Sequence, residues 1–391
     1  MLKCASVFTL EIDSIEGAVA DIKSQLEEKL PLLEHSIGIV MCHPEFIASG
    51  ILKHLRENLT FELVGTTTSS QSTNDQADEH VLTIFVMTSD DVQFVAGVTD
   101  SVIESVELPV QNAYKKISAD VQGLPKLVLT FPPLILKYSG EVYIRAWEQA
   151  IPNVPIFGSI AIDDTLTFQD SQTIFNGNSF YGSMPFVLCY GNISPRFIVG
   201  TLPLDKAMPY KCTVTKSAGP FVYEINDKNA YQYFEDIGLA HNAALTDNYL
   251  FVPFVIDQKN RQDYDNIPVI RAHASFTSDG VAIFRGEVDE GSTMSMLSAN
   301  AKDVLETTKE KAEQLIGLDN AAGALLFPCI IRQMITMRPN PIGELELVRN
   351  IIGSSLPFMM GYSGGEICPT SIRDGVPVNR FHNHSLIILV V

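Results

Sequence analysis

The feature that most constrains the fold is a pattern that recurs three times along the 391-residue chain. Each copy has a short apolar run, an amphipathic helix, a second apolar run that reaches a Gly, a loop, and a last apolar run. The copies begin near residues 35, 125 and 322. Short apolar runs bounded by turn residues are typical of buried strands. The pattern predicts an α/β (mixed α+β) protein with mixed sheets flanked by helices, built from diverged strand–helix–strand–strand repeats.

The pieces of each copy agree with this interpretation. Leu345, Val348 and Ile352 recur at helical spacing and give one helix an apolar face. A strand–helix–strand unit strongly favours a right-handed parallel crossover. We expect the glycines to mark sharp turns at the ends of the second strands, where a Cβ would not fit. These glycines are Gly65, Gly158 and Gly361.

A further strand and helix precede each copy, so the full repeat is longer. Before the third copy we assign the strand to residues 282–291 and the helix to 294–316. We divide the chain into a domain at 1–210, which holds two copies, and a domain at 211–391, which holds antiparallel strands and the third copy. The Ser/Thr/Asp-rich segment 66–79 is expected to be a mobile surface loop.

Charge and cysteine usage limit the class of function. The chain carries 46 Asp+Glu against 27 Lys+Arg, a net charge of −19, and no basic run. Because nucleic-acid binding needs clustered Lys and Arg, we expect no nucleic-acid partner. Six cysteines without C-x-x-C spacing favour reduced thiols. No apolar stretch approaches the ~20 residues of a membrane span, and no signal peptide is recognisable. The expected location is the cytoplasm, without membrane insertion.

Familiar catalytic motifs are missing. The sequence has no G-x-x-x-x-G-K-[ST], no H-E-x-x-H and no C-x-x-C-H. Nucleotide hydrolysis and zinc proteolysis therefore lose their usual sequence support.

The richest candidate site is the Gly-rich segment 361–369. Two consecutive glycines beside Ser363 and Glu366 would let backbone N–H groups approach a small anionic or zwitterionic ligand, and Glu366 could receive an amine. The alternative is a tight turn capped by these side chains. Loops at strand C-termini are common ligand sites in α/β sheets, which favours a site here.

Other residues in the third copy have two interpretations each. Arg332 could bind a carboxylate or form a structural salt bridge. His382 and His384, two apart in an expected strand, should share one face; a metal pair or haem ligand is less favoured than ordinary hydrogen bonding, because spacing supplies no third ligand. His43 could cap the following helix or reach the same cleft. The expected ligand-binding residues are Thr66, Thr67, Ser159, Arg332, Ser363, Gly364, Glu366, Asn379 and His382.

In this hypothesis the Gly364 amide and Arg332 hold a carboxylate, and Glu366 holds an amine. The competing hypothesis is a hydrolase or transferase with Cys329 or Ser363 as nucleophile and His382 as base. We expect ligand binding rather than catalysis, no required cofactor and no metal, with haem as a minor alternative.

Several motifs together resemble the FIST family. FELVGTTTS resembles its N-terminal half and VTKSAGPFVYEINDKNAYQYFEDIG the start of its C-terminal half. GEVDEGSTM, FPCIIRQM, PFMMGYSGGEICP and NRFHNHSLIIL follow in the family's order, and the resemblance covers roughly residues 35–391. It departs from the family at GTTTSS, which replaces a Gly-Cys-Ser/Thr type of turn and argues against a thiol or haem role for that loop.

The resemblance implies a prokaryotic intracellular sensory module that binds small, amino-acid-like ligands. It also implies an output partner: a histidine kinase, a diguanylate cyclase or a chemotaxis transducer. Because the family motifs reach the last residue, we expect that partner to be a separate protein. Some relatives bind haem and sense nitric oxide.

Overall fold

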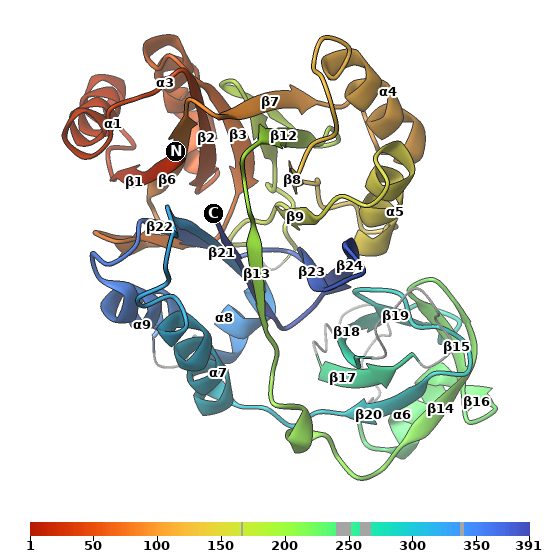
Figure 1. Cartoon of the computed structure of the whole chain (residues 1–391). Helices are drawn as coiled ribbons and strands as arrows, with labels where there is room; N and C mark the ends of the chain where they lie inside the picture. Colours follow the sequence, from red (N-terminus) through yellow and green to blue (C-terminus); the bar gives the residue numbers. More distant parts are fainter. Residues whose placement is uncertain (166, 240–251, 259–266, 337–339) are drawn as a thin grey trace.

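The computed structural model describes the chain except for residues 166, 240–251, 259–266 and 337–339. Three six-stranded mixed sheets correspond to the three sequence copies, and a fourth, antiparallel sheet forms a small barrel. Figure 1 shows the three sheets around a common centre with helices outside them and the barrel to one side. The prediction of an α/β fold with mixed sheets and diverged repeats is confirmed.

The first repeat builds a sheet in the order β1-β6-β2-β3-β10-β11. Strands β2 and β3 are parallel, and β6 runs antiparallel to β2. The helical stretch between β2 and β3 is divided into two helices at Gly50, whose φ is +79°. The elements are β1 (Lys3–Thr9), α1 (Ile15–Lys29), β2 (His35–Cys42), α2 (Glu45–Ala48), α3 (Ile51–Asn58), β3 (Glu62–Thr67), β4 (Gln71–Thr73), β5 (Ala77–Asp78) and β6 (Leu82–Ser89).

The second repeat repeats this plan in the order β24-β23-β9-β8-β12-β7. Strands β8 and β9 are parallel, and β12 runs antiparallel to β8. The elements are β7 (Val92–Val98), α4 (Glu107–Ile117), β8 (Leu127–Thr130), α5 (Gly140–Ala150), β9 (Ile156–Ser159), β10 (Thr173–Phe175), β11 (Asn178–Phe180) and β12 (Pro185–Gly191).

The third repeat has the order β13-β25-β21-β22-β4-β5 and is interrupted by the barrel. Its first strand is β13, so the assignment of that strand to residues 282–291 is wrong: β19 lies there, within the barrel. The elements outside the barrel are β13 (Arg196–Gly200), α7 (Ala301–Glu313), β21 (Ala324–Pro328), α8 (Ile330–Thr336), α9 (Gly343–Ile352), β22 (Phe358–Gly361), β23 (Glu366–Arg373), β24 (Val376–His382) and β25 (Leu386–Val390).

The barrel lies between β13 and α7 in the chain. A pairing of β14 with β15 closes the order β14-β20-β17-β18-β19-β15-β16. The sequence-based boundary at residue 210 falls just before β14, whereas β13, before that boundary, pairs with β25 after it. The elements are β14 (Cys212–Ala218), β15 (Phe221–Ile225), β16 (Lys228–Asn229), α6 (Ala230–Asp236), β17 (Val252–Asp257), β18 (Val269–Phe276), β19 (Ala282–Phe284) and β20 (Thr293–Met296).

The repeats exchange hairpins in a cycle. The hairpin β4–β5 of the first repeat pairs with β22 of the third. The hairpin β10–β11 of the second pairs with β3 of the first, and β23–β24 of the third pairs with β9 of the second. Each sheet is therefore completed by another repeat, which ties the three into one unit.

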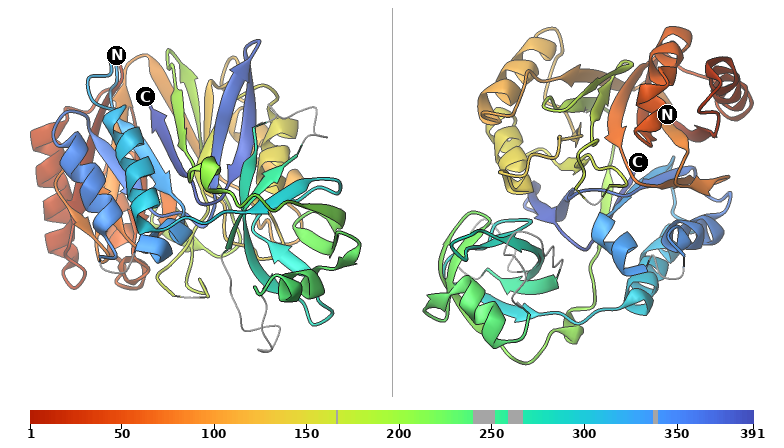
Figure 2. Two further views of the ribbon diagram at one scale, coloured as in Figure 1. Left: turned by 90° about the horizontal axis from the view of Figure 1, so that it is seen from below. Right: turned by 180° about the vertical axis from the view of Figure 1, so that it is seen from behind.

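The three sheets share one apolar core. Their inner faces meet around buried residues of every sheet, including Phe85, Phe157, Val187, Phe327 and Leu389. The outer faces pack on the amphipathic helices, which Figure 2 shows from two further sides. Burying these apolar surfaces supplies the main driving force for the fold. None of the helices in the described part of the chain is long and apolar enough to cross a membrane.

The Ser/Thr-rich segment after Gly65 is not a mobile surface loop, contrary to the prediction. Residues 66–73 are buried and continue from β3 into β4. Their hydroxyls bond to backbone groups: Thr68 Oγ1 donates to the carbonyl of Tyr362 at 2.8 Å. Composition misled here because hydroxyl side chains that bond locally are as suited to a buried junction as to a loop.

The glycines of the second strands are needed for close strand approach rather than for turns. A Cβ on Gly65 would lie 1.8 Å from the carbonyl oxygen of Val40, and one on Gly158 would lie 2.1 Å from that of Thr130. Gly65→Ala should lower the free energy of unfolding by about 1–3 kcal/mol or more, because the obstructing atom belongs to the backbone of β2. Urea unfolding measures this change. Gly343→Ala, whose Cβ would meet nothing nearer than 3.4 Å, is the control and should behave like the wild type; equal losses in both variants would contradict the packing argument.

Candidate functional site

The loops that follow the glycine strands meet at a three-loop junction, made of residues 67–70, 160–162 and 362–365. The N–H of Tyr362 donates to Ser70, and that of Ile162 donates to Thr67. The Gly364 N–H donates to the carbonyl of Ile160 at 2.9 Å. Each loop is thus hydrogen-bonded to the other two. These bonds couple the positions of the three loops, and so of the three repeats.

Each loop is also fixed to the end of the strand that runs parallel to the glycine strand of its own repeat. The N–H of Thr68 donates to Cys42, that of Ala161 to Pro132, and that of Ser363 to Pro328. These equivalent bonds place the ends of β2, β8 and β21 beside the junction. They satisfy backbone groups that would otherwise be buried without partners.

Three of the expected site residues form a row across neighbouring strands. In the register of β24, β23 and β9, Glu366 lies opposite His382 on one side and opposite Ser159 on the other. Directly opposed residues of antiparallel strands present their side chains on the same face. All three side chains are buried, and His382 Nε2 lies 3.0 Å from the carbonyl of Cys368.

Glu366 is the unusual member of the row. Its side chain is fully buried, and neither carboxyl oxygen makes a well-formed hydrogen bond among the described residues. The Ser159 hydroxyl likewise has no partner there. Burial raises the pKa of Glu366 well above its ordinary value, although the nearby Cys329 thiol and Ser385 N–H oppose the shift. Burial therefore favours the neutral carboxyl, and its oxygens have unused hydrogen-bonding capacity.

Cys329 faces this carboxyl. Burial, reinforced by the neighbouring Glu366, raises the pKa of Cys329 well above its ordinary value. A thiol held in its protonated form is a poor nucleophile. The other candidate nucleophile, Ser363, donates its hydroxyl to the carbonyl of Gly365 at 2.8 Å and so closes the local turn.

His384 does not share a strand face with His382, contrary to the prediction. Strand β24 ends at His382, and His384 adopts a left-handed conformation at φ 56°. Burial, together with the charge of Arg332, lowers the pKa of His384 to about 3, so its imidazole is neutral. Neither ring nitrogen has a hydrogen-bond partner in the described part of the chain.

Arg332 is engaged within the protein. Its Nε and Nη2 donate to Glu344 Oε1 at 2.9 and 2.8 Å, and Nη1 donates to the carbonyl of His384 at 3.2 Å. Nη2 also donates to Thr308 Oγ1 at 2.6 Å. Both charged side chains of the ion pair are fully buried. These contacts favour the structural salt bridge over the ligand contact that the sequence left open.

The remaining expected residues lie around this row or away from it. Thr66 and Thr67 are buried in β3, and their hydroxyls donate to the carbonyl of Gln172. Asn379 fixes the hairpin β23–β24 to the start of β9, because its Oδ1 accepts the Ile156 N–H and its Nδ2 donates to Val154. The structure therefore brings Ser159, Ser363, Gly364, Glu366 and His382 together and places Asn379 elsewhere.

Sequence reasoning missed Glu344 and gave His384 too little weight. Glu344 lies in the first turn of α9 and meets Arg332 only through the packing of α8 and α9, and no local motif signals that contact. His384 stands in the segment NRFHNHS, which was singled out in the sequence. Because the strand was expected to continue through it, His384 was treated only as a neighbour of His382.

Comparison with known families agrees with the resemblance seen in the sequence. Residues 36–228 match the FIST N domain, and residues 230–369 match the FIST C domain. No curated protein matches the sequence significantly. Among solved structures, a cyanuric acid hydrolase from A. caulinodans matches with a TM-score of 0.37 and 9% identity, over 100% of this chain and 99% of that chain.

Proposed function

The chain belongs to the FIST family of sensory modules, and on that premise we propose that it binds a small amine-bearing ligand and signals to a separate output protein. The observation that carries this proposal is the fully buried Glu366, whose carboxyl oxygens lack well-formed hydrogen bonds among the described residues. A buried polar group without partners costs free energy, and a ligand donor removes that cost.

The ligand's amine is the group that this site suits best. An ammonium offers three donors, and the Glu366 carboxyl and the Ser159 hydroxyl, directly opposite each other in the β9–β23 register, can accept from it. The carboxylate-binding half of the sequence hypothesis has no support here, because Arg332 and the Gly364 N–H already donate to protein acceptors. We therefore propose amino compounds as the ligand class, without a required α-carboxylate.

Signalling would follow from the position of Glu366 at the three-loop junction. An amine bound at Glu366 would shift β23, which is paired with β24 and with β9 of another repeat. We propose that this shift alters the surface that a cytoplasmic kinase, cyclase or chemotaxis transducer recognises. A ligand acts as a signal only through its different affinity for the two conformations.

The proposal is tested by thermal stabilisation with matched pairs of ligands. Each amino compound is compared with its des-amino analogue, such as alanine with propionate. At least one amine should raise the melting temperature of the wild type, its analogue should not, and Glu366→Gln should abolish the shift. Because Glu366 must ionise to hold an ammonium, binding should tighten as the pH rises from acidic to mildly alkaline values.

Two outcomes would contradict the proposal. Equal stabilisation by an amine and its des-amino analogue would show that the amine is not recognised. Unchanged binding by Glu366→Gln would place the ligand elsewhere. A Soret band in protein produced with haem would instead direct attention to His384.

A further inference from the structure

A second group of polar side chains lies at the end of β2, outside the Glu366 row. His43 directly follows the last residue of that strand, and its side chain is only 6% exposed. The N–H of Glu45 donates to His43 Nδ1 at 3.4 Å, so Nδ1 is the acceptor nitrogen of the ring. The ring is thus held with one lone pair facing the start of α2, as the helix-capping interpretation expected.

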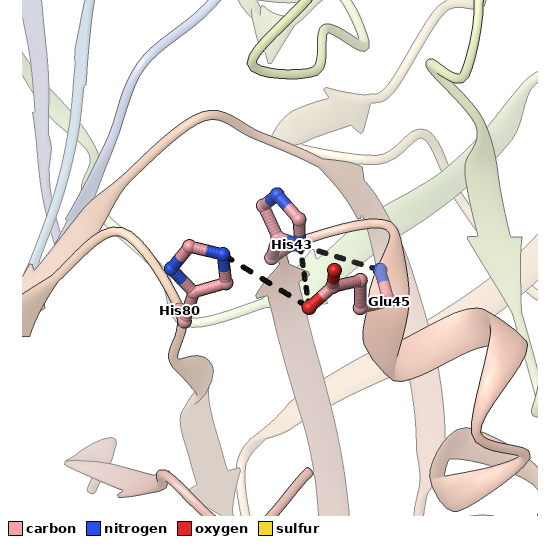
Figure 3. A group of neighbouring side chains, drawn as sticks. All are labelled: His43, Glu45 and His80. Atoms are coloured by element: carbon pink, nitrogen blue, oxygen red, sulfur yellow. Dashed lines mark hydrogen bonds and ion pairs between the residues drawn. The ribbon is translucent and has the colours of Figure 1, made fainter.

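Two more ligand-type side chains meet His43 at that lone pair. Glu45 Oε2 lies 3.8 Å from His43 Nδ1 and 3.9 Å from His80 Nε2. The two imidazole centroids are 4.5 Å apart. Figure 3 shows one carboxylate oxygen of Glu45 facing both rings from one side, with His80 reaching in from the segment after β5. One ligand atom from each residue lies within 4.8 Å of the others.

These distances approach those around a bound metal ion. Ligand atoms about 2.0–2.2 Å from a tetrahedral Zn²⁺ lie roughly 3.3–3.6 Å from one another. The ligand atoms lie up to 4.8 Å apart and would have to move closer together, which the exposed side chains can do, since Glu45 is 60% and His80 56% exposed. The exposure also gives a hydrated ion a path to the site.

A fourth residue lies behind the buried histidine. Asp164 Oδ1 is 3.3 Å from His43 Nε2, on the side of the ring away from Glu45, but Nε2 makes no hydrogen bond in the described part of the chain, so the carboxylate would have to turn to accept its N–H. Metal-binding histidines commonly direct their other ring N–H to a carboxylate, which fixes the tautomer and raises the basicity of the ligand nitrogen. The loop that carries Asp164 is fixed by its neighbour Asp163, which accepts the N–H of Thr165 and of Asp170 at 2.6 and 2.7 Å.

We propose that His43 Nδ1, Glu45 Oε2 and His80 Nε2 bind one divalent first-row transition ion of the Zn²⁺ class, with Asp164 as a positioning residue. The ion would take the Nδ1 lone pair in place of the long contact from the Glu45 N–H. Two imidazoles and one carboxylate suit such borderline ions better than Mg²⁺ or Ca²⁺, which prefer all-oxygen sites. Three protein ligands leave a coordination position open to water or to a small molecule.

The proposed site lies where the first repeat, which supplies the three ligands, meets the second, which supplies Asp164. His43 follows Cys42, whose carbonyl accepts the Thr68 N–H at the three-loop junction. Asp164 lies two residues after Ile162, whose N–H donates to Thr67 at the same junction. An ion at this site would therefore stiffen the part of the junction where these two repeats meet.

The test is a titration of the full chain with Co²⁺, whose visible absorption reports ligand geometry, followed by displacement with Zn²⁺. The wild type should bind one Co²⁺ per chain with a saturable band, and His80→Ala should lose that band. Asp164→Asn should keep the band and the stoichiometry but bind about 10–100-fold more weakly.

The matched control is His35→Ala. His35 Nε2 also lies 3.9 Å from a carboxylate, that of Glu34, but the pair is not part of a three-residue ligand group in the described chain. This variant should bind like the wild type. Thermal unfolding without metal checks that all variants are folded. The proposal is overturned if the wild type shows no saturable band, or if wild type and His80→Ala bind alike.

Discussion

Replacing Arg332 with Ala should lower the free energy of unfolding by about 3–5 kcal/mol, because the fully buried Glu344 would lose its charged partner. The same change removes donors from the carbonyl of His384 and from Thr308. Urea unfolding followed by circular dichroism measures the loss. A second variant that also replaces Glu344, Arg332→Met with Glu344→Gln, should recover part of it, since no buried charge is left alone.

The control is Arg349→Ala, on the last turn of the adjacent helix α9. A partly exposed helix arginine should change stability by no more than about 0.5 kcal/mol. If Arg332→Ala keeps wild-type stability and loses only ligand binding, then the ligand-contact interpretation of Arg332 is right and the structural one is wrong.

Replacing Arg271 with Ala should have a comparable effect on the attachment of the barrel. Arg271, on β18, donates from Nη2 to Glu141 Oε1 on α5 at 2.7 Å and from Nη1 to the carbonyl of Phe381 on β24 at 3.1 Å. Both charged side chains are almost fully buried. The expected loss is about 3–5 kcal/mol, with faster proteolytic cleavage between barrel and repeats.

The neighbouring pair of Arg145 and Glu287 provides a matched control. It joins the same helix to the barrel region at 2.8 Å, but Arg145 is 45% exposed. Arg145→Ala should therefore cost no more than about 1 kcal/mol. Similar small losses in both variants would show that Arg271 does not hold the barrel. Because Phe381 precedes His382, a firm Arg271 contact would also carry a shift of the Glu366 row to the barrel.

Much of the architecture could be predicted from local pattern. The apolar runs, the helical faces and the three glycines identify the repeats because each depends on neighbouring residues. The exchange of hairpins could not be predicted, since β4 and β22 are far apart in the sequence and pair only in three dimensions. The strand that precedes the third copy was assigned wrongly for the same reason: β13 is identified by its pairing with β25.

The site was predicted less completely than the fold. The Gly-rich loop led to Ser363 and Glu366 because glycines and a strand end are local signals. The partner of Arg332 and the meeting of His80 with His43 depend on packing between distant elements. A sequence lists such polar residues without showing which of them are already satisfied.

The most direct test of amine binding at Glu366 is native mass spectrometry of the wild type and Glu366→Gln. Both proteins are incubated with a mixture of amino compounds and their des-amino analogues. The expected result is a one-to-one adduct of an amine-bearing compound on the wild type that is absent from the variant. No adduct on the wild type, or the same adduct on both proteins, would contradict it.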